Sequence, residues 1–151
     1  MNGKNTKILA KYLLTKGVDS ALKIQKMLFF FRVEEKRSNF PSQNDSYFNE
    51  KDNFEAWIYG PVNVESFKEM QKLFRNEAEK EDYLLDKNEI SKIDKLYLNF
   101  YNEYIRYSAR ELVEKSHKNF AWIEARGDLG PDDICHTKLN EDSENFTKFE
   151  F

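Results

Sequence analysis

Apolar residues recur at helical spacing over most of this chain. The first such segment covers residues 6–16 and carries its apolar positions on one stripe. Asn5 precedes it where a capping side chain is favoured, and Gly17 follows it where a helix commonly stops. This pattern predicts an amphipathic helix with one buried face.

The next segment, residues 21–36, is apolar on nearly every side of a helix, and Ser20 is placed to cap it. A helix of this kind is normally the buried centre of a fold. Gln25 and Lys26 are polar residues within it, so they need a satisfied environment or an exposed strip. We expect them to mark a narrow solvated edge or to contact a partner.

A short aromatic region follows and predicts β-structure. Tyr47 and Phe48 are separated from residues 54–58 by the polar residues 49–53, a spacing that favours a hairpin. The sequence then turns sharply within residues 56–62, which read Ala-Trp-Ile-Tyr-Gly-Pro-Val.

Three residues define this corner. Gly60 supplies backbone freedom, and Pro61 fixes φ and removes a donor, so an extended segment is expected to stop here. Asn63 can then cap a new helix. We expect the segment around Trp57, Gly60, Pro61 and Val62 to be structural first.

The second half of the chain continues the helical pattern with one interruption, the charged stretch 76–88, which we expect to be an exposed loop. Ser108 and Glu111 form an S-x-x-E capping box. The expected elements are helices over 64–74, 90–104 and 108–117, a helical turn over 122–126, a loop over 127–137, and within 127–151 a short acidic helix capped by Asn140 that uses Phe146 and Phe149.

These elements predict a mainly α (α+β) fold, in which residues 1–151 form a single compact helical domain with a small β-hairpin between helix 2 and helix 3. Hydrophobic residues make up 40% of the chain, and 13 Phe and 8 Tyr supply enough aromatic bulk for a core although 34% of the residues are charged.

No feature marks the chain for a membrane or for secretion. No apolar run approaches the ~20 residues that cross a bilayer, and the N-terminus lacks the apolar block of a signal peptide. The single Cys135 excludes an internal disulfide. We therefore expect a soluble, cytoplasmic protein.

The net charge of −3 is unevenly distributed. Residues 1–37 hold nine Lys or Arg and three Asp or Glu, a net charge of +6, so the remainder carries −9. A basic N-terminal face could meet nucleic acid or an acidic partner. We favour the simpler alternative, that it faces solvent or the protein's own acidic segments, because the acidity of the whole chain weakens the case for a nucleic-acid partner.

Recognisable catalytic or cofactor chemistry is not found in the sequence. No phosphate-binding glycine loop is present. Cys135, His136 and His117 have poor spacing for zinc, and further ligands would be needed. Cys135 with His117 could be imagined as nucleophile and base, but we favour the simpler interpretation, a loop thiol and a histidine at a helix end. We expect no metal, no cofactor and no catalytic residues.

The aromatic residues Trp57, Tyr59 and Trp122 allow two interpretations. They could form a base-stacking platform or a ligand pocket. Trp57 and Trp122 are alternatively core residues, whereas the hydroxyl of Tyr59 must reach water or a partner.

Three segments together resemble the Panacea (SocA-like) domain family, often labelled phage-associated proteins. They are residues 24–31 (Ile-Gln-Lys-Met-Leu-Phe-Phe-Phe), the corner 56–62, and a helix from Ser108 that ends in His117 and is followed by Trp122. The resemblance runs from about residue 8 to residue 126. One departure is Ala121, where the family often has Pro.

The resemblance implies a non-enzymatic protein-interaction domain, an antitoxin that neutralises a cognate protein toxin, with a further role as an adaptor presenting the toxin to a protease. We predict that Gln25, Lys26 and Tyr59 bind this partner. A phage or mobile-element protein without a toxin partner is an open alternative. Two others are a small nucleic-acid-binding regulator using the basic N-terminal helices and, more weakly, a hydrolase around His117.

Overall fold

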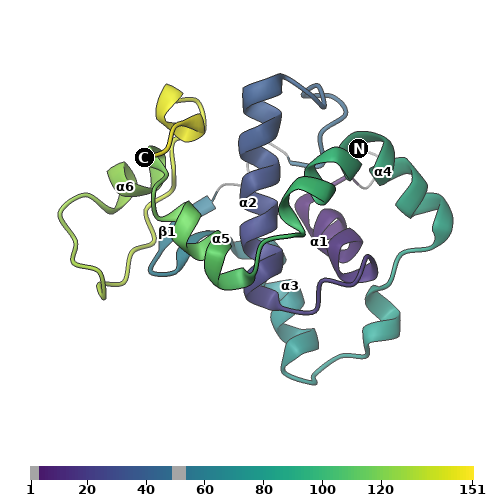
Figure 1. The fold of residues 1–151 in the computed structure, drawn as a ribbon. Coiled ribbons are helices and arrows are strands. Elements are labelled where there is room, and N and C mark those ends of the chain that lie inside the picture. Colours follow the sequence, from purple (N-terminus) through teal and green to yellow (C-terminus); the bar gives the residue numbers. More distant parts are fainter. Residues whose placement is uncertain (1–3, 49–53) are drawn as a thin grey trace.

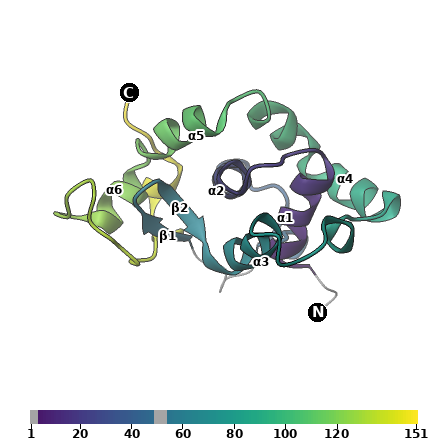
Figure 2. The ribbon, with the colours of Figure 1, turned by 90° about the horizontal axis from the view of Figure 1, so that it is seen from below.

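Helix α2 forms the axis of the structure, and the other elements surround it. The computed structural model describes residues 4–48 and 54–151. Viewed along α2, the helices α1, α3, α4 and α5 and the hairpin lie around it (Figure 2). The elements are α1 (Thr6–Thr15), α2 (Ala21–Ser38), β1 (Phe54–Trp57), β2 (Gly60–Asn63), α3 (Val64–Phe74), η1 (Lys80–Tyr83), α4 (Lys87–Tyr104), α5 (Ala109–Ser116), α6 (Phe120–Arg126) and η2 (Glu144–Thr147).

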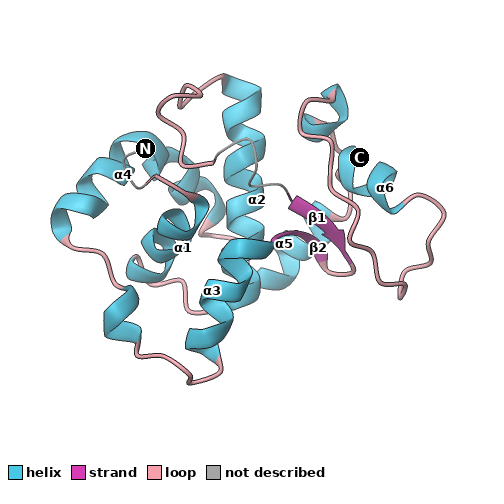
Figure 3. Ribbon diagram, turned by 180° about the vertical axis from the view of Figure 1, so that it is seen from behind, coloured by secondary structure: helices cyan, strands magenta, loops and turns pink. Residues whose placement is uncertain are grey.

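This arrangement confirms the mainly α fold with a small antiparallel hairpin between the second and third helices. Figure 1 shows α1, α3 and α4 on one side of α2, and the hairpin, α6 and the C-terminal segment on the other. Helix α5 connects the two sides, and Figure 3 shows the strands beside α5.

The caps predicted for α1, α2 and α5 are present. The side chain of Asn5 accepts a hydrogen bond from the backbone N–H of Ile8, and Ser20 does the same for Lys23. Ser108 and Glu111 form the reciprocal capping box. Gly17 follows α1 with φ +110°, a conformation that favours glycine.

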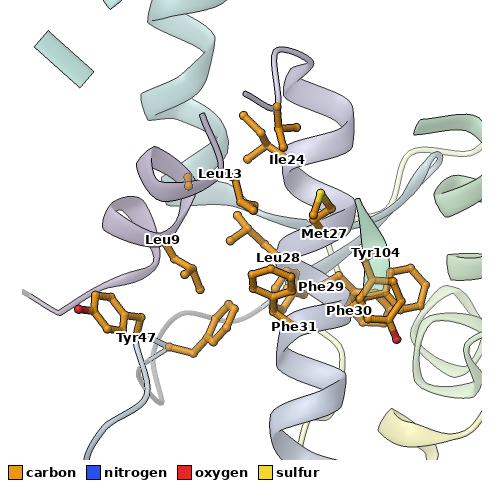
Figure 4. Packing of buried hydrophobic residues seen from close by; sticks show 14 of the residues in the cluster. Leu9, Leu13, Ile24, Met27, Leu28, Phe29, Phe30, Phe31, Tyr47 and Tyr104 are labelled. Atoms are coloured by element: carbon orange, nitrogen blue, oxygen red, sulfur yellow. The ribbon is translucent and has the colours of Figure 1, made fainter. Parts of the chain in front are cut away.

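The core is built on aromatic side chains that leave α2 on different sides (Figure 4). The ring of Phe29 lies 5.6 Å from those of Phe54 and Phe146, so α2 joins the hairpin to the C-terminal segment. On the other side, Phe31 stacks on Tyr97 of α4 at 5.7 Å. All four phenylalanine rings and Tyr97 are buried completely. Aromatic pairs of this geometry contribute roughly 0.5–1.5 kcal/mol each beyond area burial.

The hairpin does not form between the strands that the sequence predicts. Strand β1 pairs with β2, with Trp57 opposite Gly60, and Tyr47-Phe48 is not a strand. The predicted turn 49–53 lies outside the described residues. Tyr47 and Phe48 are apolar because they fill the core.

The expectation that an extended segment stops at Pro61 is also wrong, because Pro61 lies within β2. A sheet of two strands has only edge strands, and an edge tolerates the missing N–H of proline. The free edge of β1 instead meets the C-terminal loop: Ala56 N–H donates to Thr137 O, and Leu139 N–H donates to Phe54 O.

Two further expectations need correction. The charged stretch 76–88 contains the 3₁₀-helix η1, whose Tyr83 is buried, and α4 already begins at Lys87. The last short helix is the 3₁₀-helix η2, which is capped by Ser143 rather than by Asn140. Its Phe146 enters the core as the pattern suggests.

The basic residues of the N-terminal part do not form one free face. Arg32 is buried and pairs with Glu35 and Glu141, at 3.0 and 2.7 Å. Lys16 pairs with Asp94 at 3.4 Å. Much of the excess positive charge is therefore matched by acidic residues elsewhere in the chain. Among the described residues, no helix is long and apolar enough to cross a membrane.

Candidate functional site

The corner between β1 and β2 is held by side chains from α5 and α6. Three consecutive backbone carbonyls of the corner each accept one hydrogen bond from this direction. The donors are Arg126 Nη1 to Ala56 O, Trp122 Nε1 to Trp57 O and His117 Nε2 to Ile58 O, each at 2.9 Å. These side chains replace the water that a turn at the surface would use.

The environment of His117 fixes its protonation. Its Nε2 must carry a proton because it faces the carbonyl oxygen of Ile58, which can only accept. The imidazole stacks on Trp122 with 4.5 Å between ring centroids. Burial lowers the pKa of His117, partly opposed by the bond to Ile58, so the neutral form is favoured. His117 is therefore a structural donor to the corner.

Helix α2 holds the same corner from the opposite side. Lys26 Nζ donates to Pro61 O at 2.7 Å. Gln25 accepts from the backbone N–H of Asn63 and donates to the hydroxyl of Ser66, both at 2.9 Å. Gln25 and Lys26 thus satisfy backbone and cap groups at the point where β2 becomes α3.

Lys26 has an unusual environment for an amine. Its side chain is completely buried, and among the residues described here no carboxylate lies within ion-pair distance. Burial lowers the pKa of Lys26 to about 7, because the charged form loses its hydration. Its amine is therefore partly neutral near physiological pH.

Gly60 is required at this corner for two reasons. Its φ of +109° is a conformation that residues with a side chain rarely adopt. A Cβ at this position would also lie 2.3 Å from Ser116 Oγ and 3.2 Å from Lys26 Cε. The glycine allows α2 and α5 to approach the turn together.

A cavity of about 640 Å³ opens beside the corner. We call it the corner cavity. It lies between α2, the hairpin, α3 and the loop after α6, and its lining residues are Ala21, Leu22, Gln25, Lys26, Trp57, Ile58, Tyr59, Val62, Phe67, Ile134, Cys135 and His136.

Three large apolar side chains are exposed at this cavity: Leu22 at 39%, Tyr59 at 66% and Ile134 at 77%. We call these three the rim. Below the rim, Trp57 packs edge-to-face on Phe67 at 5.1 Å, and its Nε1 donates to Glu55. The surface is thus apolar but built on side chains with fixed partners.

The residues singled out in the sequence meet at this place. Trp57, Gly60, Pro61, Val62, His117 and Trp122 all belong to the corner or to the groups that hold it. The expectation that Gln25 and Lys26 mark a solvated edge is wrong, because both are buried. Of the three residues predicted to bind a partner, only Tyr59 is exposed; their binding role stays a prediction.

Arg126 also holds the corner, although the sequence analysis assigns it no role. It lies four residues after Trp122, so both side chains share one face of α6. The spacing of four residues between Trp122 and Arg126, directly after the helix that ends in His117, is the feature of the sequence that could have indicated this role. Leu22, Phe67 and Ile134 were also missed, since they come from segments far apart in the sequence.

Catalytic and metal-binding interpretations gain nothing from the geometry. The thiol of Cys135 points to Ala125 O at 3.8 Å, whereas His117 is bonded to Ile58 O. His136 Nδ1 lies 2.9 Å from a Glu55 carboxylate oxygen. Within the described ranges no group of three His, Cys, Asp or Glu side chains could hold a metal ion.

Comparison with known families gives one match. The family described as "Antitoxin SocA-like, Panacea domain" matches residues 24–123, about two thirds of the chain. The matched part begins in α2 and ends in α6, so it includes the whole hairpin corner together with His117 and Trp122. No curated protein matches the chain, and no solved structure does.

Proposed function

The chain belongs to the SocA-like antitoxin family of Panacea domains, and from this premise we propose that it neutralises a protein toxin by binding it at the rim of the corner cavity. The proposal combines the family with one structural observation, the exposed apolar rim of Leu22, Tyr59 and Ile134. An antitoxin of this kind works by protein–protein contact, so no catalytic group is assigned. We also propose that it acts in the cytoplasm, where it would meet such a toxin.

The exposed rim supports a protein partner because its composition suits an interface. Nine large apolar residues are exposed in the described part of the chain, and three of them surround this single cavity. Interfaces concentrate their binding free energy in a few anchors, among which tyrosine is enriched, beside well-packed pockets. Tyr59 occupies the turn between β1 and β2 and is the one aromatic residue of the rim.

Gln25 and Lys26 contribute to this surface from below. Their hydrogen bonds to Asn63 and Pro61 fix the backbone that carries Tyr59 and Val62. A preorganised turn loses less conformational entropy on binding than a mobile one. We therefore assign Tyr59 to direct contact, and Gln25 and Lys26 to positioning the turn and lining the cavity.

The experiment that tests the proposal begins with the toxin. Each reading frame adjacent to the gene is expressed alone and together with this chain. One neighbour is expected to stop growth alone and to be tolerated with the chain. If no neighbour is both toxic and rescued, the antitoxin proposal is contradicted for this protein.

The same strains distinguish two modes of neutralisation. If the chain presents the toxin to a protease, the half-life of the toxin shortens when the chain is present, and removing the protease restores toxicity. If the chain blocks the toxin by occupying its surface, the half-life stays the same and a stable complex is recovered. We propose the second mode, because the rim offers a surface for direct contact.

A further inference from the structure

We infer that the corner cavity binds a small apolar molecule carrying one carboxylate, and that the buried amine of Lys26 pairs with this carboxylate. This inference does not depend on the antitoxin proposal, because the cavity can bind a small molecule whether or not its rim binds a toxin, and the binding can be measured without a toxin.

The size and walls of the cavity suit a small ligand. Its volume of about 640 Å³ lies within the range of roughly 300–1,000 Å³ that is typical of small-molecule sites. Its walls come from four separate parts of the chain and are largely aliphatic and aromatic, with Leu22, Val62, Phe67 and Ile134 among them. Such sites usually combine apolar walls with a few fixed polar groups.

The fixed polar group is Lys26. An ammonium has three N–H donors, and in the described chain Pro61 O is the acceptor found for Lys26 Nζ. Burying a charge without a counter-ion is unfavourable. The amine has no exposed surface in this structure, so the side chains that cover it must move before an anion in the cavity can reach Nζ. That anion would supply the partner that the described residues do not provide.

Among the described residues, the other titratable groups around Lys26 do not supply a counter-ion for its amine. At the C-terminal end of α5, burial lowers the pKa of His117, which favours its neutral form, and its Nε2 is already bonded to Ile58 O. In the loop after α6, Cys135 is buried, and His136 faces the carboxylate of Glu55 on β1. Glu55 also accepts from Trp57 Nε1, so its carboxylate is engaged away from Lys26.

A single carboxylate fits better than the other common ligand groups. A phosphate carries more charge and needs several donors, usually arginine or a cluster of backbone N–H groups. No arginine lines the cavity. A neutral apolar molecule would fill the space but leave the amine of Lys26 unpaired. A ligand carrying an ammonium group would be repelled by the charged form of Lys26.

Pairing with Lys26 makes binding depend on pH in a definite direction. Burial lowers the pKa of Lys26 to about 7 in the empty cavity, and a bound carboxylate raises it again. Above pH 7 binding therefore requires uptake of a proton. We expect the affinity for the acid to fall about tenfold or more between about pH 6.5 and about pH 8.5.

The test uses three acids of different shape as probes: phenylbutyrate, decanoate and indolepropionate. Each is compared with its alcohol and its amine by titration calorimetry on the full chain, with methyl resonances of Leu22, Val62 and Ile134 reporting the site and Leu84 as a remote reference. We expect at least one acid to bind at millimolar or lower concentration, about tenfold more tightly than its alcohol, with shifts confined to the cavity residues.

Two variants sharpen the assignment. Lys26→Met replaces the amine with an apolar chain of similar length, and we expect it to lose both the preference for the acid over the alcohol and the pH dependence. Lys87→Met, an exposed lysine at the start of α4, serves as the matched control and should bind like the wild type.

The inference is overturned if none of the three acids binds the wild-type chain at millimolar concentration, or if acid and alcohol bind equally. Binding of a short peptide that ends in a free Phe carboxylate, without binding of any free acid, would also overturn it in favour of a peptide terminus. These comparisons use the wild-type chain, so they decide the question even if Lys26→Met does not fold.

Discussion

Replacing Lys26 with Met tests the structure of the corner through the pH dependence of stability. Lys26 is completely buried, and burial lowers its pKa to about 7, compared with about 10.4 for an unfolded lysine. Below pH 7 the side chain is protonated in both the folded and the unfolded chain, so the folded chain bears the full cost of a buried charge. Between pH 7 and about 10 the unfolded chain binds a proton that the folded chain lacks, and stability rises with pH.

The expected size follows from this difference. Each pH unit in that window is worth about 1.4 kcal/mol, so the wild type should gain about 2–3 kcal/mol from pH 7 to pH 9 relative to Lys26→Met. The variant also loses the bond to Pro61 O, which contributes on the order of 1 kcal/mol at every pH. At about pH 6 the variant should therefore match or exceed the wild type in stability.

Urea unfolding of both proteins, followed by tryptophan fluorescence and circular dichroism between pH 6 and 9, measures this difference. Comparing the two proteins at each pH cancels the other titrating groups. Lys87→Met is the control and should run parallel to the wild type, because Lys87 is exposed. If Lys26→Met also runs parallel to the wild type, Lys26 is not buried without a counter-ion, and our description of the corner is refuted.

Three further predictions concern the corner, the extent of the domain and the alternative function. Gly60→Val should lower the free energy of unfolding by about 1–3 kcal/mol or more, since it combines a positive φ with a close approach to Ser116; an unchanged melting temperature would show that the turn is drawn incorrectly. Phe146→Ala should cost about 3–5 kcal/mol, with fluorescence and circular dichroism unfolding together, if residues 1–151 form one domain; separate transitions would contradict this. A mobility-shift titration should show no sub-micromolar, salt-sensitive binding to DNA or RNA, because Lys16, Arg32 and other basic residues are paired within the fold. Such binding, if it is lost in a Lys4, Lys7, Lys11 triple alanine variant, would favour the alternative function of a nucleic-acid-binding regulator.

The sequence predicts local features of this fold well. Helix caps depend on residues three positions apart, so Asn5, Ser20 and Ser108 could be assigned from spacing alone. The hairpin between the second and third helices was also expected. The strand that pairs with β1 was not expected to be β2, because β2 contains Pro61 and its sequence resembles a turn. Tyr47 and Phe48 were expected to form that strand because they have strand-like character, but they are packed in the core.

The candidate site depends on contacts that spacing cannot reveal. Lys26 and Pro61 are 35 positions apart, and Arg126 and Ala56 are 70 apart. A polar residue in an apolar helix can be exposed or can satisfy a distant backbone group, and the helical pattern is the same in both cases. The corner motif could therefore be identified from the sequence, but the side chains that hold it and the cavity beside it required the three-dimensional structure.

The central claim, that the rim of the corner cavity binds the toxin, is tested most directly by measuring the affinity of the purified toxin for rim variants. Tyr59→Ala removes the aromatic ring of the rim, and Leu84→Ala removes an exposed apolar side chain that does not line the cavity. Both should fold, as their melting temperatures can confirm. We predict that Tyr59→Ala weakens toxin binding about tenfold or more while Leu84→Ala leaves it unchanged. Equal affinities for the wild type and Tyr59→Ala would contradict the account and place the toxin on another surface.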